Sequence, residues 1–276
     1  MNSQPTCTYN MNGKVAVVTG AAGAIGSGIC RGLLNANCRV AVTDLAGPRL
    51  DSMVDELKSA YPDRVIGVPM DVTDEASVAD SVAAISKTWG SLDIAVINAG
   101  VAHVSPLKEM DLTAFQRLEK INVEGTLLVL KQLARHFENQ GTGGDIVLVS
   151  TKNVFSPGAT FGAYSATKAA SHQLARIASL ELAGIDVRVN MVAPDAVFSD
   201  GERKSGLWQE VGPGRMKARG LDEKGLEDYY QSRNLLKAKV TADHVANAVL
   251  FFASRQTPTT GATIPVDGGL PDATPR

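Results

Sequence analysis

The chain has 276 residues, of which 44% are apolar and 20% are charged, and this composition indicates a folded globular protein. Its net charge of -2 and its pI of about 6.1 provide no electrostatic attraction to nucleic acid or an anionic membrane, so we expect neither as a partner. The three cysteines lack metal-ligand spacing, and no apolar run approaches the ~18 residues of a membrane span. We therefore expect a cytoplasmic protein without a metal site or a disulfide framework.

Strands and helices alternate along most of the chain. Apolar runs typical of buried strands occur at residues 14–19, 39–43, 64–69, 92–97, 145–150, 186–192 and 262–266. Helical patterns lie between them at residues 25–36, 48–61, 75–89, 114–139, 160–183 and 241–254. Crossovers of this length require parallel strands. The sequence therefore predicts a single α/β domain over residues 13–276, with a doubly wound, Rossmann-like parallel sheet of about seven strands and helices on both faces.

Two segments fall outside this alternation. Residues 1–12 form a polar leader without the basic and apolar regions of a secretory signal, and they are candidates for disorder. Residues 199–236 are rich in glycine and charge and show only a weak helical pattern. A long excursion between a strand and a helix is more often a lid or a binding loop than an idle connection, so we expect this segment to cover the substrate.

A glycine-rich turn follows the first predicted strand and opens the first helix. It contains Gly20, Gly23 and Gly26, and glycine there lets backbone N–H groups approach a pyrophosphate at a helix N-terminus. Asp44 ends the second strand, where its carboxylate can accept hydrogen bonds from adenosine ribose hydroxyls and would repel the 2′-phosphate of NADP. Together the two features predict a dinucleotide site that uses NAD.

Tyr164 and Lys168 are four residues apart in a predicted helix, so their side chains lie on one face, one turn apart. A phenol titrates near pH ~10 when unperturbed, and a nearby lysine cation lowers its pKa. The pair is therefore a candidate general acid/base near neutral pH. On its own, the spacing is also compatible with a solvated helix face.

Together these motifs resemble those of the short-chain dehydrogenases/reductases, from about residue 14 to residue 269. In that family's pattern, Tyr164 exchanges a proton with the substrate hydroxyl, Lys168 binds the nicotinamide ribose and Asn122 anchors a water that leads to the lysine. The resemblance implies a catalytic set of Asn122, Thr151, Tyr164 and Lys168. It implies a cofactor-binding set of Gly20, Gly23, Ala24, Ile25, Gly26, Asp44, Asp71, Val72, Asn98, Ala99, Gly100, Tyr164, Lys168, Pro194 and Val197.

Two departures from the family pattern affect these sets. Ala24 stands where the family usually has glycine, and its methyl group fits if the loop shifts slightly. Thr151 stands at the position of the family's catalytic serine, and it keeps the hydroxyl while its extra methyl group restricts the rotamer. Ser150 is the alternative, although a neighbouring strand position should point to the opposite face.

A third departure is Asp195, which replaces a glycine and places a carboxylate beside the nicotinamide pocket; Val197 and Ser199 are expected beside the carboxamide. The expected substrate contacts are Thr151, Lys152, Asn153 and Asp195, with His103 near the mouth of the pocket. The predicted lid adds the basic residues Arg203, Lys204, Arg215, Lys217 and Arg219. They could bind a hydroxyl-rich or anionic substrate, although a solvated charged loop explains them equally well.

Residues 150–153, 190–197 and 227–237 resemble more closely the dehydrogenase portion of bifunctional rhamnulose-phosphate aldolase/lactaldehyde dehydrogenases and, more weakly, sorbitol-6-phosphate dehydrogenases. This chain shows no aldolase portion. The likeness implies that the substrate is a small polyol, sugar or hydroxyaldehyde. Family habit further implies a homo-oligomer, usually a tetramer.

We therefore expect an NAD-dependent oxidoreductase that transfers a hydride between nicotinamide and a carbinol or carbonyl carbon while Tyr164 moves the proton. A sugar-phosphate or ketone reductase on the same residues is one alternative. A catalytically weak NAD-sensing or scaffold protein is the other, and Thr151 is the feature that favours it.

Overall fold

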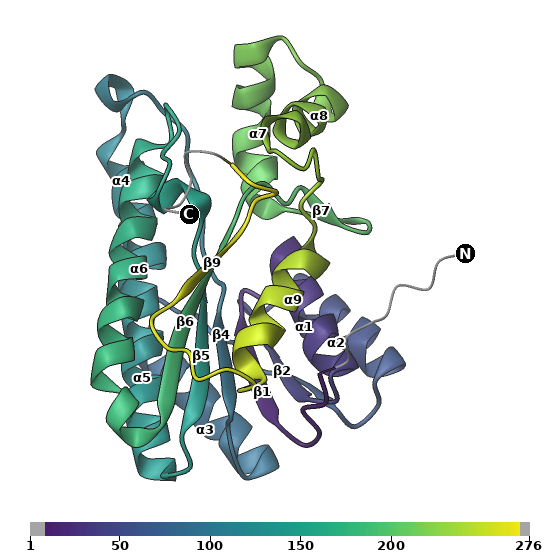
Figure 1. Cartoon of the computed structure of the whole chain (residues 1–276), viewed down its shortest axis with the longest axis vertical. Coiled ribbons are helices and arrows are strands. Elements are labelled where there is room, and N and C mark those ends of the chain that lie inside the picture. Colours follow the sequence, from purple (N-terminus) through teal and green to yellow (C-terminus); the bar gives the residue numbers. More distant parts are fainter. Residues whose placement is uncertain (1–8, 271–276) are drawn as a thin grey trace.

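The computed structural model describes residues 9–270 and is built on one seven-stranded sheet (Figure 1). The strands run in the order β3-β2-β1-β4-β5-β6-β9, and every neighbouring pair is parallel. They are β1 (Val15–Thr19), β2 (Arg39–Thr43), β3 (Val65–Gly67), β4 (Ile94–Ile97), β5 (Gly144–Val149), β6 (Val187–Pro194) and β9 (Thr263–Val266). The strand order reverses between β1 and β4, which opens a crevice at their carboxyl ends. The predicted doubly wound α/β fold is confirmed.

Helices cover both faces of the sheet. On one face lie α1 (Ala24–Asn35), α2 (Pro48–Ala60) and α9 (Ala242–Ala253), and on the other α3 (Glu75–Trp89), α5 (Gly125–Gln140) and α6 (Gly162–Glu181). Alternate residues of β1 divide between them: Ala16 and Val18 join the first core, and Val15 and Val17 the second. Central strands are thus apolar on both sides, which explains their continuous apolar runs.

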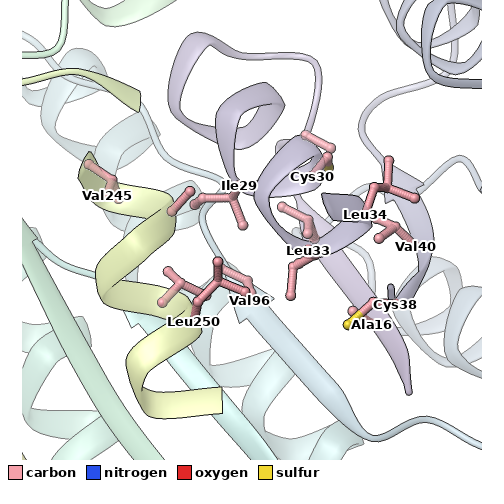
Figure 2. Packing of buried hydrophobic residues seen from close by; sticks show 14 of the residues in the cluster. Ala16, Ile29, Cys30, Leu33, Leu34, Cys38, Val40, Val96, Val245 and Leu250 are labelled. Atoms are coloured by element: carbon pink, nitrogen blue, oxygen red, sulfur yellow. The ribbon is translucent and has the colours of Figure 1, made fainter. Parts of the chain in front are cut away.

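The first core is closely packed around α1 and α9. Figure 2 shows Ile29 of α1 directed towards α9, whose Leu250 lies on the facing side, and both belong to the first core. The helices approach so closely that a Cβ atom on Gly28 would lie 2.4 Å from the Cβ of Ala242. This packing fixes α1, and with it the glycine turn at its start, against the sheet.

The long helix predicted over residues 114–139 is divided into three parts. It starts as α4 (Leu112–Leu118), widens into a π-helical turn, η2 (Glu119–Glu124), and continues as α5. A π-helical turn inside an α-helix frequently marks a functional site. Short 3-10 turns lie elsewhere, at η1 (Leu107–Glu109), η3 (Lys152–Val154) and η4 (Ala183–Ile185).

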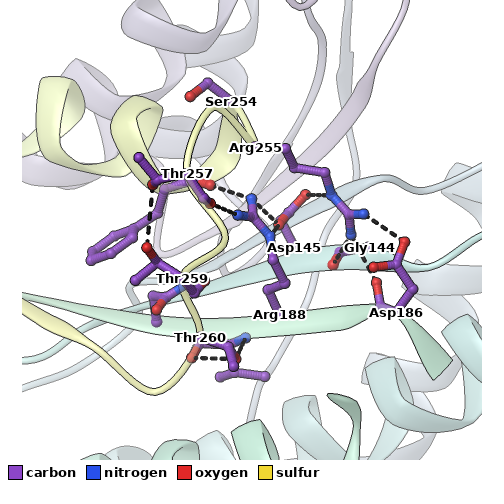
Figure 3. A network of polar contacts seen from close by, with 12 residues as sticks. Gly144, Asp145, Asp186, Arg188, Ser254, Arg255, Thr257, Thr259 and Thr260 are labelled. Atoms are coloured by element: carbon purple, nitrogen blue, oxygen red, sulfur yellow. Dashed lines mark hydrogen bonds and ion pairs between the residues drawn. The ribbon is translucent and has the colours of Figure 1, made fainter. Parts of the chain in front are cut away.

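At the amino ends of the central strands, a charged network ties the sheet to the segment after α9 (Figure 3). Asp145 of β5 accepts hydrogen bonds from Arg188 of β6 at 2.7 Å and from Arg255 at 2.8 Å. Arg188 also donates to the carbonyl oxygens of Phe252 and Thr257. Arg255 also donates to the carbonyl oxygens of Gly144 and Asp186 and to the carboxylate of Asp186. Every nitrogen of both guanidinium groups therefore has a partner.

The weak helical pattern assigned to residues 199–236 underestimated their structure. The segment folds as a hairpin, β7 (Ser199–Asp200) and β8 (Arg203–Lys204), followed by α7 (Gly206–Arg219) and α8 (Glu223–Arg233). Figure 1 shows α7 and α8 side by side beyond one end of the sheet. Side chains cap both helices, Ser205 at the start of α7 and Asp222 at the start of α8. The predicted excursion is therefore an ordered helical pair.

The predicted disordered leader is only partly within the described residues, because residues 1–8 lie outside them. Met11 is buried, and its N–H group donates to the carbonyl oxygen of Ala36 at 2.8 Å. Tyr9 and Met11 pack against the first core, so the expectation of disorder does not hold for this part of the leader. Within residues 9–270, none of the helices is both long enough and apolar enough to span a bilayer.

Candidate active site

One cleft of about 790 Å³ lies at the carboxyl ends of the central strands. Of the residues in the predicted catalytic and cofactor-binding sets, all of which the structure describes, Asn122 is the one that does not line it. The cofactor candidates that line it are Gly20, Gly23, Ala24, Ile25, Gly26, Asp44, Asp71, Val72, Asn98, Ala99, Gly100, Tyr164, Lys168, Pro194 and Val197. Thr151, Lys152, Asn153 and Asp195 line the same cleft. The fold therefore gathers residues from six loops into one site.

The glycine turn forms a cradle that side chains would fill. Gly20 adopts a φ of 61°, and a Cβ atom there would lie 2.8 Å from the Cα of Ala99. A Cβ on Gly26 would lie 2.5 Å from the carbonyl oxygen of Gly20. The Asn98 side chain closes the other side by donating to the carbonyl oxygens of Thr19 and Gly20, at 3.0 Å and 2.9 Å. The cradle at the start of α1 fits a dinucleotide pyrophosphate.

Asp44 stands at the end of β2 beside this cradle. Its Oδ2 accepts a hydrogen bond from the N–H group of Ala22 at 3.0 Å, and its Oδ1 accepts one from Leu45 at 2.9 Å. These bonds hold the carboxylate at the cleft wall. Arg49 also lines the cleft, but its guanidinium lies 3.4 Å from the carbonyl oxygen of Ala22. At the end of β2 the cleft wall therefore carries a fixed carboxylate with an arginine nearby.

The residues predicted to hold the adenine, Asp71 and Val72, line the same cleft. Asp71 accepts two hydrogen bonds from Thr73, from the N–H group at 2.9 Å and from the hydroxyl at 2.8 Å. Val72 packs against α5, where a Cβ on Gly125 would lie 2.9 Å from its Cγ2. Gly125 thus lets the start of α5 approach the loop that carries both residues.

Tyr164 and Thr151 meet at the opposite end of the cleft. Both side chains are buried, and a hydrogen bond joins the phenol to the Thr151 hydroxyl. Thr151 Oγ1 also accepts from the N–H group of Asn153 at 3.2 Å, which holds the threonine rotamer. Ser150, the alternative to Thr151, instead lies 2.9 Å from His172 through its Oγ. The structure thus brings the threonine, and not Ser150, to the tyrosine.

Lys168 lies one turn after Tyr164 on α6, and its ammonium group donates to the carbonyl oxygen of Val149 at 2.7 Å. Asn122 stands behind the cleft wall, in the π-helical turn. Its amide exchanges two hydrogen bonds of 2.9 Å with the backbone of Val101 and donates to the hydroxyl of Thr167 at 3.1 Å. Asn122 therefore clamps the loop after β4 onto α6, and its part in a proton relay stays a prediction.

Burial perturbs both groups of the tyrosine–lysine pair. It raises the pKa of Tyr164 to about 12, and the hydrogen bond from Thr151 opposes this rise. It lowers the pKa of Lys168 to about 8. The ammonium group of Lys168 is turned towards Val149 and is not among the causes of the tyrosine shift, so its lowering of the tyrosine pKa stays a prediction.

The substrate end of the cleft contains residues that the sequence did not single out. Asp195 is not a free carboxylate, because Arg233 of α8 donates to both of its oxygens, at 3.0 Å and 2.7 Å. Phe161, Trp208 and Tyr230 supply aromatic walls; Tyr230 belongs to the quoted segment 227–237, whereas no motif marked Phe161 or Trp208. Ser199 was misplaced beside the carboxamide, because it pairs with Lys204 in the hairpin and does not line the cleft.

The five basic residues predicted for the lid have different surroundings. Arg203 pairs with Glu56 at 2.6 Å, and Lys204 pairs with Glu223 at 2.8 Å. Arg219 stacks over the ring of Tyr229, and Lys217 is exposed. Of the five, Arg215 is the one that lines the cleft. His103 lies outside the cleft wall, 4.0 Å from Glu210. Over residues 9–270, no cluster of three or more His, Cys, Asp and Glu side chains could hold a metal ion.

Comparison with known proteins is consistent with this arrangement. A family model described as short chain dehydrogenase matches residues 14–210. The uncharacterized oxidoreductase YuxG of Bacillus subtilis (strain 168) is 36% identical over 265 residues, 95% of this chain but 38% of YuxG. The mitochondrial (-)-isopiperitenol/(-)-carveol dehydrogenase of Mentha piperita is 34% identical over 262 residues, 94% of this chain and 93% of that protein. The structure of sorbitol-6-phosphate 2-dehydrogenase SrlD from Erwinia amylovora is 30% identical, with a TM-score of 0.84 over 92% of this chain and 98% of that one.

Proposed function

Because the chain belongs to the short-chain dehydrogenase family, an enzyme family that acts on CH–OH groups, we propose that it uses NAD and a tyrosine acid/base to interconvert an alcohol and a carbonyl compound. The observation that carries the proposal is the meeting of Thr151, Tyr164 and Lys168 at one end of a cleft whose other end is a glycine cradle. This arrangement supports a role for Tyr164 as proton donor or acceptor to a carbinol oxygen bound beside a nicotinamide.

The protein groups act on the substrate oxygen and its proton. Thr151 would hold the oxygen by a hydrogen bond, and Tyr164 would take the hydroxyl proton in oxidation or return it in reduction. Lys168 would orient the nicotinamide ribose and favour the phenolate as its cation approaches. The nicotinamide, when bound, supplies or accepts the hydride. Asn122 would anchor a water that leads to Lys168 and so complete the path of the proton.

The preference for NAD rests on Asp44. A fixed carboxylate at the end of β2 can accept hydrogen bonds from ribose hydroxyls, whereas a 2′-phosphate would lie against the same negative charge. Arg49 opposes this argument in part, because a rotation of its side chain would offer a positive charge to NADP. Its present contact with Ala22 supports the NAD assignment.

A small polyol, sugar or hydroxyaldehyde fits the substrate end better than an apolar alcohol. Lys152, Asn153, Asp195 and Arg233 line it, and these groups favour a molecule rich in hydroxyls. The likeness to a sorbitol-6-phosphate 2-dehydrogenase supports this class, while the likeness to a dehydrogenase of isopiperitenol and carveol shows that related chains act on other alcohols. The resemblance to rhamnulose-phosphate aldolase/lactaldehyde dehydrogenases remains part of the proposal.

We treat the chain as one domain in which residues 199–236 form the substrate lid. Ser205, Leu207 and Trp208 of this segment line the cleft, which supports that role. We also propose a homotetramer, because Leu127 of α5 and Ile177 and Leu180 of α6 are exposed on neighbouring helices. The chain spans 38% of YuxG, so any activity of that longer protein beyond a dehydrogenase step is a separate matter.

The test is a screen for NADH or NADPH formation by the purified protein. Polyols, aldoses, lactaldehyde and their phosphorylated counterparts are offered with NAD and with NADP in parallel, and the corresponding carbonyl compounds with the reduced cofactors. We expect turnover of at least one member with NAD and far less with NADP. Turnover in the reductive direction alone would favour the ketone or sugar-phosphate reductase. Binding of NADH without any turnover would favour the sensor protein and contradict the proposal.

A further inference from the structure

Three basic side chains line the substrate end of the cleft, and a single carboxylate, Asp195, pairs with one of them. The three are Lys152 of η3, Arg215 of α7 and Arg233 of α8, and Asp195 pairs with Arg233. Electrostatic interactions connect Lys152 with both arginines and with Asp195, so the four groups form one cluster. Glu210 also lines the cleft, but it is held by Arg117 at 3.2 Å. The cluster thus has a positive excess.

Arg215 is the least compensated member. Its side chain belongs to a residue that is 9% exposed, and its hydrogen-bond partners are the neutral groups Thr160 Oγ1, Ala159 O and Tyr230 OH, at 3.2–3.5 Å. Its Nε is buried and has no hydrogen-bond partner among the described residues. A buried guanidinium without a carboxylate is costly, which indicates that an anion from outside completes it.

The backbone beside Arg215 supports this interpretation. Thr160, whose hydroxyl accepts from the arginine, adopts a φ of 72°, a conformation that a β-branched residue rarely takes. Its carbonyl oxygen accepts from the N–H group of Ser105 at 2.9 Å, which fixes the loop. Strain of this kind concentrates at sites where function needs a particular placement. Here the strained conformation of Thr160 holds its hydroxyl in position to accept the hydrogen bond from Arg215.

The distance between Arg215 and Tyr164, the proposed acid/base, can be spanned by a small substrate. Its guanidinium carbon lies 4.9 Å from the ring centre of Phe161, whose ring centre is 6.1 Å from that of Tyr164. One aromatic ring therefore separates the arginine from the catalytic phenol. A short carbon chain could place its reacting carbinol at Tyr164 and its other end at Arg215.

The other two basic groups strengthen the same end. Arg233 uses one nitrogen for both oxygens of Asp195 and stacks over the ring of Tyr230 at 4.1 Å, while its Nε is buried and has no partner within residues 9–270. Lys152 donates to the carbonyl oxygen of Ser156 at 3.0 Å and keeps further N–H groups for a ligand. Two arginine forks and an ammonium group are the donors that phosphates and carboxylates bind best.

We propose that Arg215, with Lys152 and Arg233, binds an anionic group, a phosphate or a carboxylate, at the end of the substrate away from the reacting carbinol. This inference rests on the proposed dehydrogenase function, because the position of the anion is defined by its distance from Tyr164, the proposed acid/base. It narrows the substrate class to phosphorylated or carboxylated polyols and hydroxyaldehydes.

The first experiment compares matched substrates. Each straight-chain polyol of three to six carbons is assayed with NAD alongside its terminal phosphate ester and its terminal carboxylic acid. The wild-type protein should show kcat/KM at least about tenfold higher for one anionic form than for the neutral polyol. The better anion identifies which of the two groups binds. Equal or better turnover of the neutral polyol would overturn the inference while leaving the dehydrogenase function in place.

Variants then assign the effect to Arg215. Arg215→Gln should lower kcat/KM for the anionic substrate about 100-fold, mostly through KM, and should lower kcat/KM for the neutral polyol far less. Arg215→Lys should recover part of the loss. Lys217→Gln removes an exposed positive charge two residues away on α7 and serves as the control. Equal losses on neutral and anionic substrates in Arg215→Gln would show a merely structural role and overturn the inference.

A binding measurement keeps the inference testable if no substrate is turned over. Inorganic phosphate is titrated into the NADH complex of the wild-type protein and of the Arg215 and Lys217 variants by calorimetry. We expect saturable binding that Arg215→Gln weakens about tenfold or more and that Lys217→Gln preserves. Absence of turnover would then contradict the proposed function alone. Absence of saturable phosphate binding, or equal binding by both variants, would overturn the anion site.

Discussion

Two arginine clusters lie at opposite ends of the central strands, and they are completed differently. At the amino ends, Arg188 and Arg255 share Asp145, and each of their nitrogen atoms donates to a carboxylate or a carbonyl oxygen (Figure 3). At the carboxyl ends, Arg215 and Arg233 each keep a buried Nε without a partner among the described residues.

The difference separates a structural cluster from one prepared for a ligand. A network that satisfies its own donors gains nothing from an added anion, and removing one of its buried members destabilises the folded chain because the partners are left unpaired. A cluster in which buried N–H donors lack a hydrogen-bond acceptor is incomplete until a ligand supplies one. The same residue type therefore serves stability at one end of the sheet and recognition at the other. Matched substitutions in the two clusters test this distinction.

The largest effect is expected from Asp145→Asn. The change leaves the largely buried Arg188 without its carboxylate, whereas the more exposed Arg255 keeps its ion pair with Asp186, so the free energy of unfolding should fall by about 3 kcal/mol. Urea denaturation measures this loss, and kcat/KM well below the melting temperature should be close to wild type. A loss of less than about 1 kcal/mol would show that the amino-end network is not a stability element.

A smaller effect is expected from the same substitution in the other cluster, Asp195→Asn. Arg233 loses its counter-ion, but it still stacks on Tyr230 and faces the cleft, so we expect a stability loss of about 1–2 kcal/mol. The positive excess of the cleft rises, and phosphate should bind about tenfold more tightly to the NADH complex. Unchanged or weaker phosphate binding would contradict the contrast between the clusters.

The smallest expected effect is a loss of folding stability when the pH is lowered. Burial lowers the pKa of His172, which contacts Ser150 and Thr263, to about 4. The unfolded chain therefore takes up this proton from its ordinary pKa of 6.5 downwards while the folded chain resists, and stability is lost as the pH falls from 6.5 to 4. Burial raises the pKa of Asp145, so its folded form takes up a proton first and acid costs no stability there.

The melting temperature at pH 7 and at pH 5 measures this difference. The wild-type protein should melt a few degrees lower at pH 5, and His172→Gln should lose part of that decrease. Asp145→Asn should keep it. An acid effect that persists in full in the His172 variant would assign it to another group.

The cofactor end of the cleft could be predicted from sequence because its residues follow strands directly. The glycine turn and Asp44 each sit at the end of a continuous apolar run, and parallel strands bring their carboxyl ends to one edge. The spacing of Tyr164 and Lys168 likewise survives in α6, because four residues make one helical turn.

The substrate end could not be predicted in the same way. Gly212, Pro213 and Gly214 conceal the helix α7, since glycine and proline both disfavour a helix interior. Packing outweighs these propensities: Val211 and Arg215 of α7 are buried, and the arginine lies over Phe161. Arg215 meets Thr160, a residue 55 positions earlier, and such a contact is invisible to local periodicity. The ion pair of Asp195 with Arg233 escaped for the same reason.

The most direct measurement of the central claim compares turnover with cofactor binding in Tyr164→Phe. The substitution removes the phenol oxygen that Thr151 contacts and keeps the ring that packs against Phe161. We predict that kcat with the best substrate of the screen falls by about 10³-fold or more, while the NADH dissociation constant changes by less than about threefold. Turnover within about tenfold of wild type would contradict the assignment of Tyr164 as the acid/base of this enzyme.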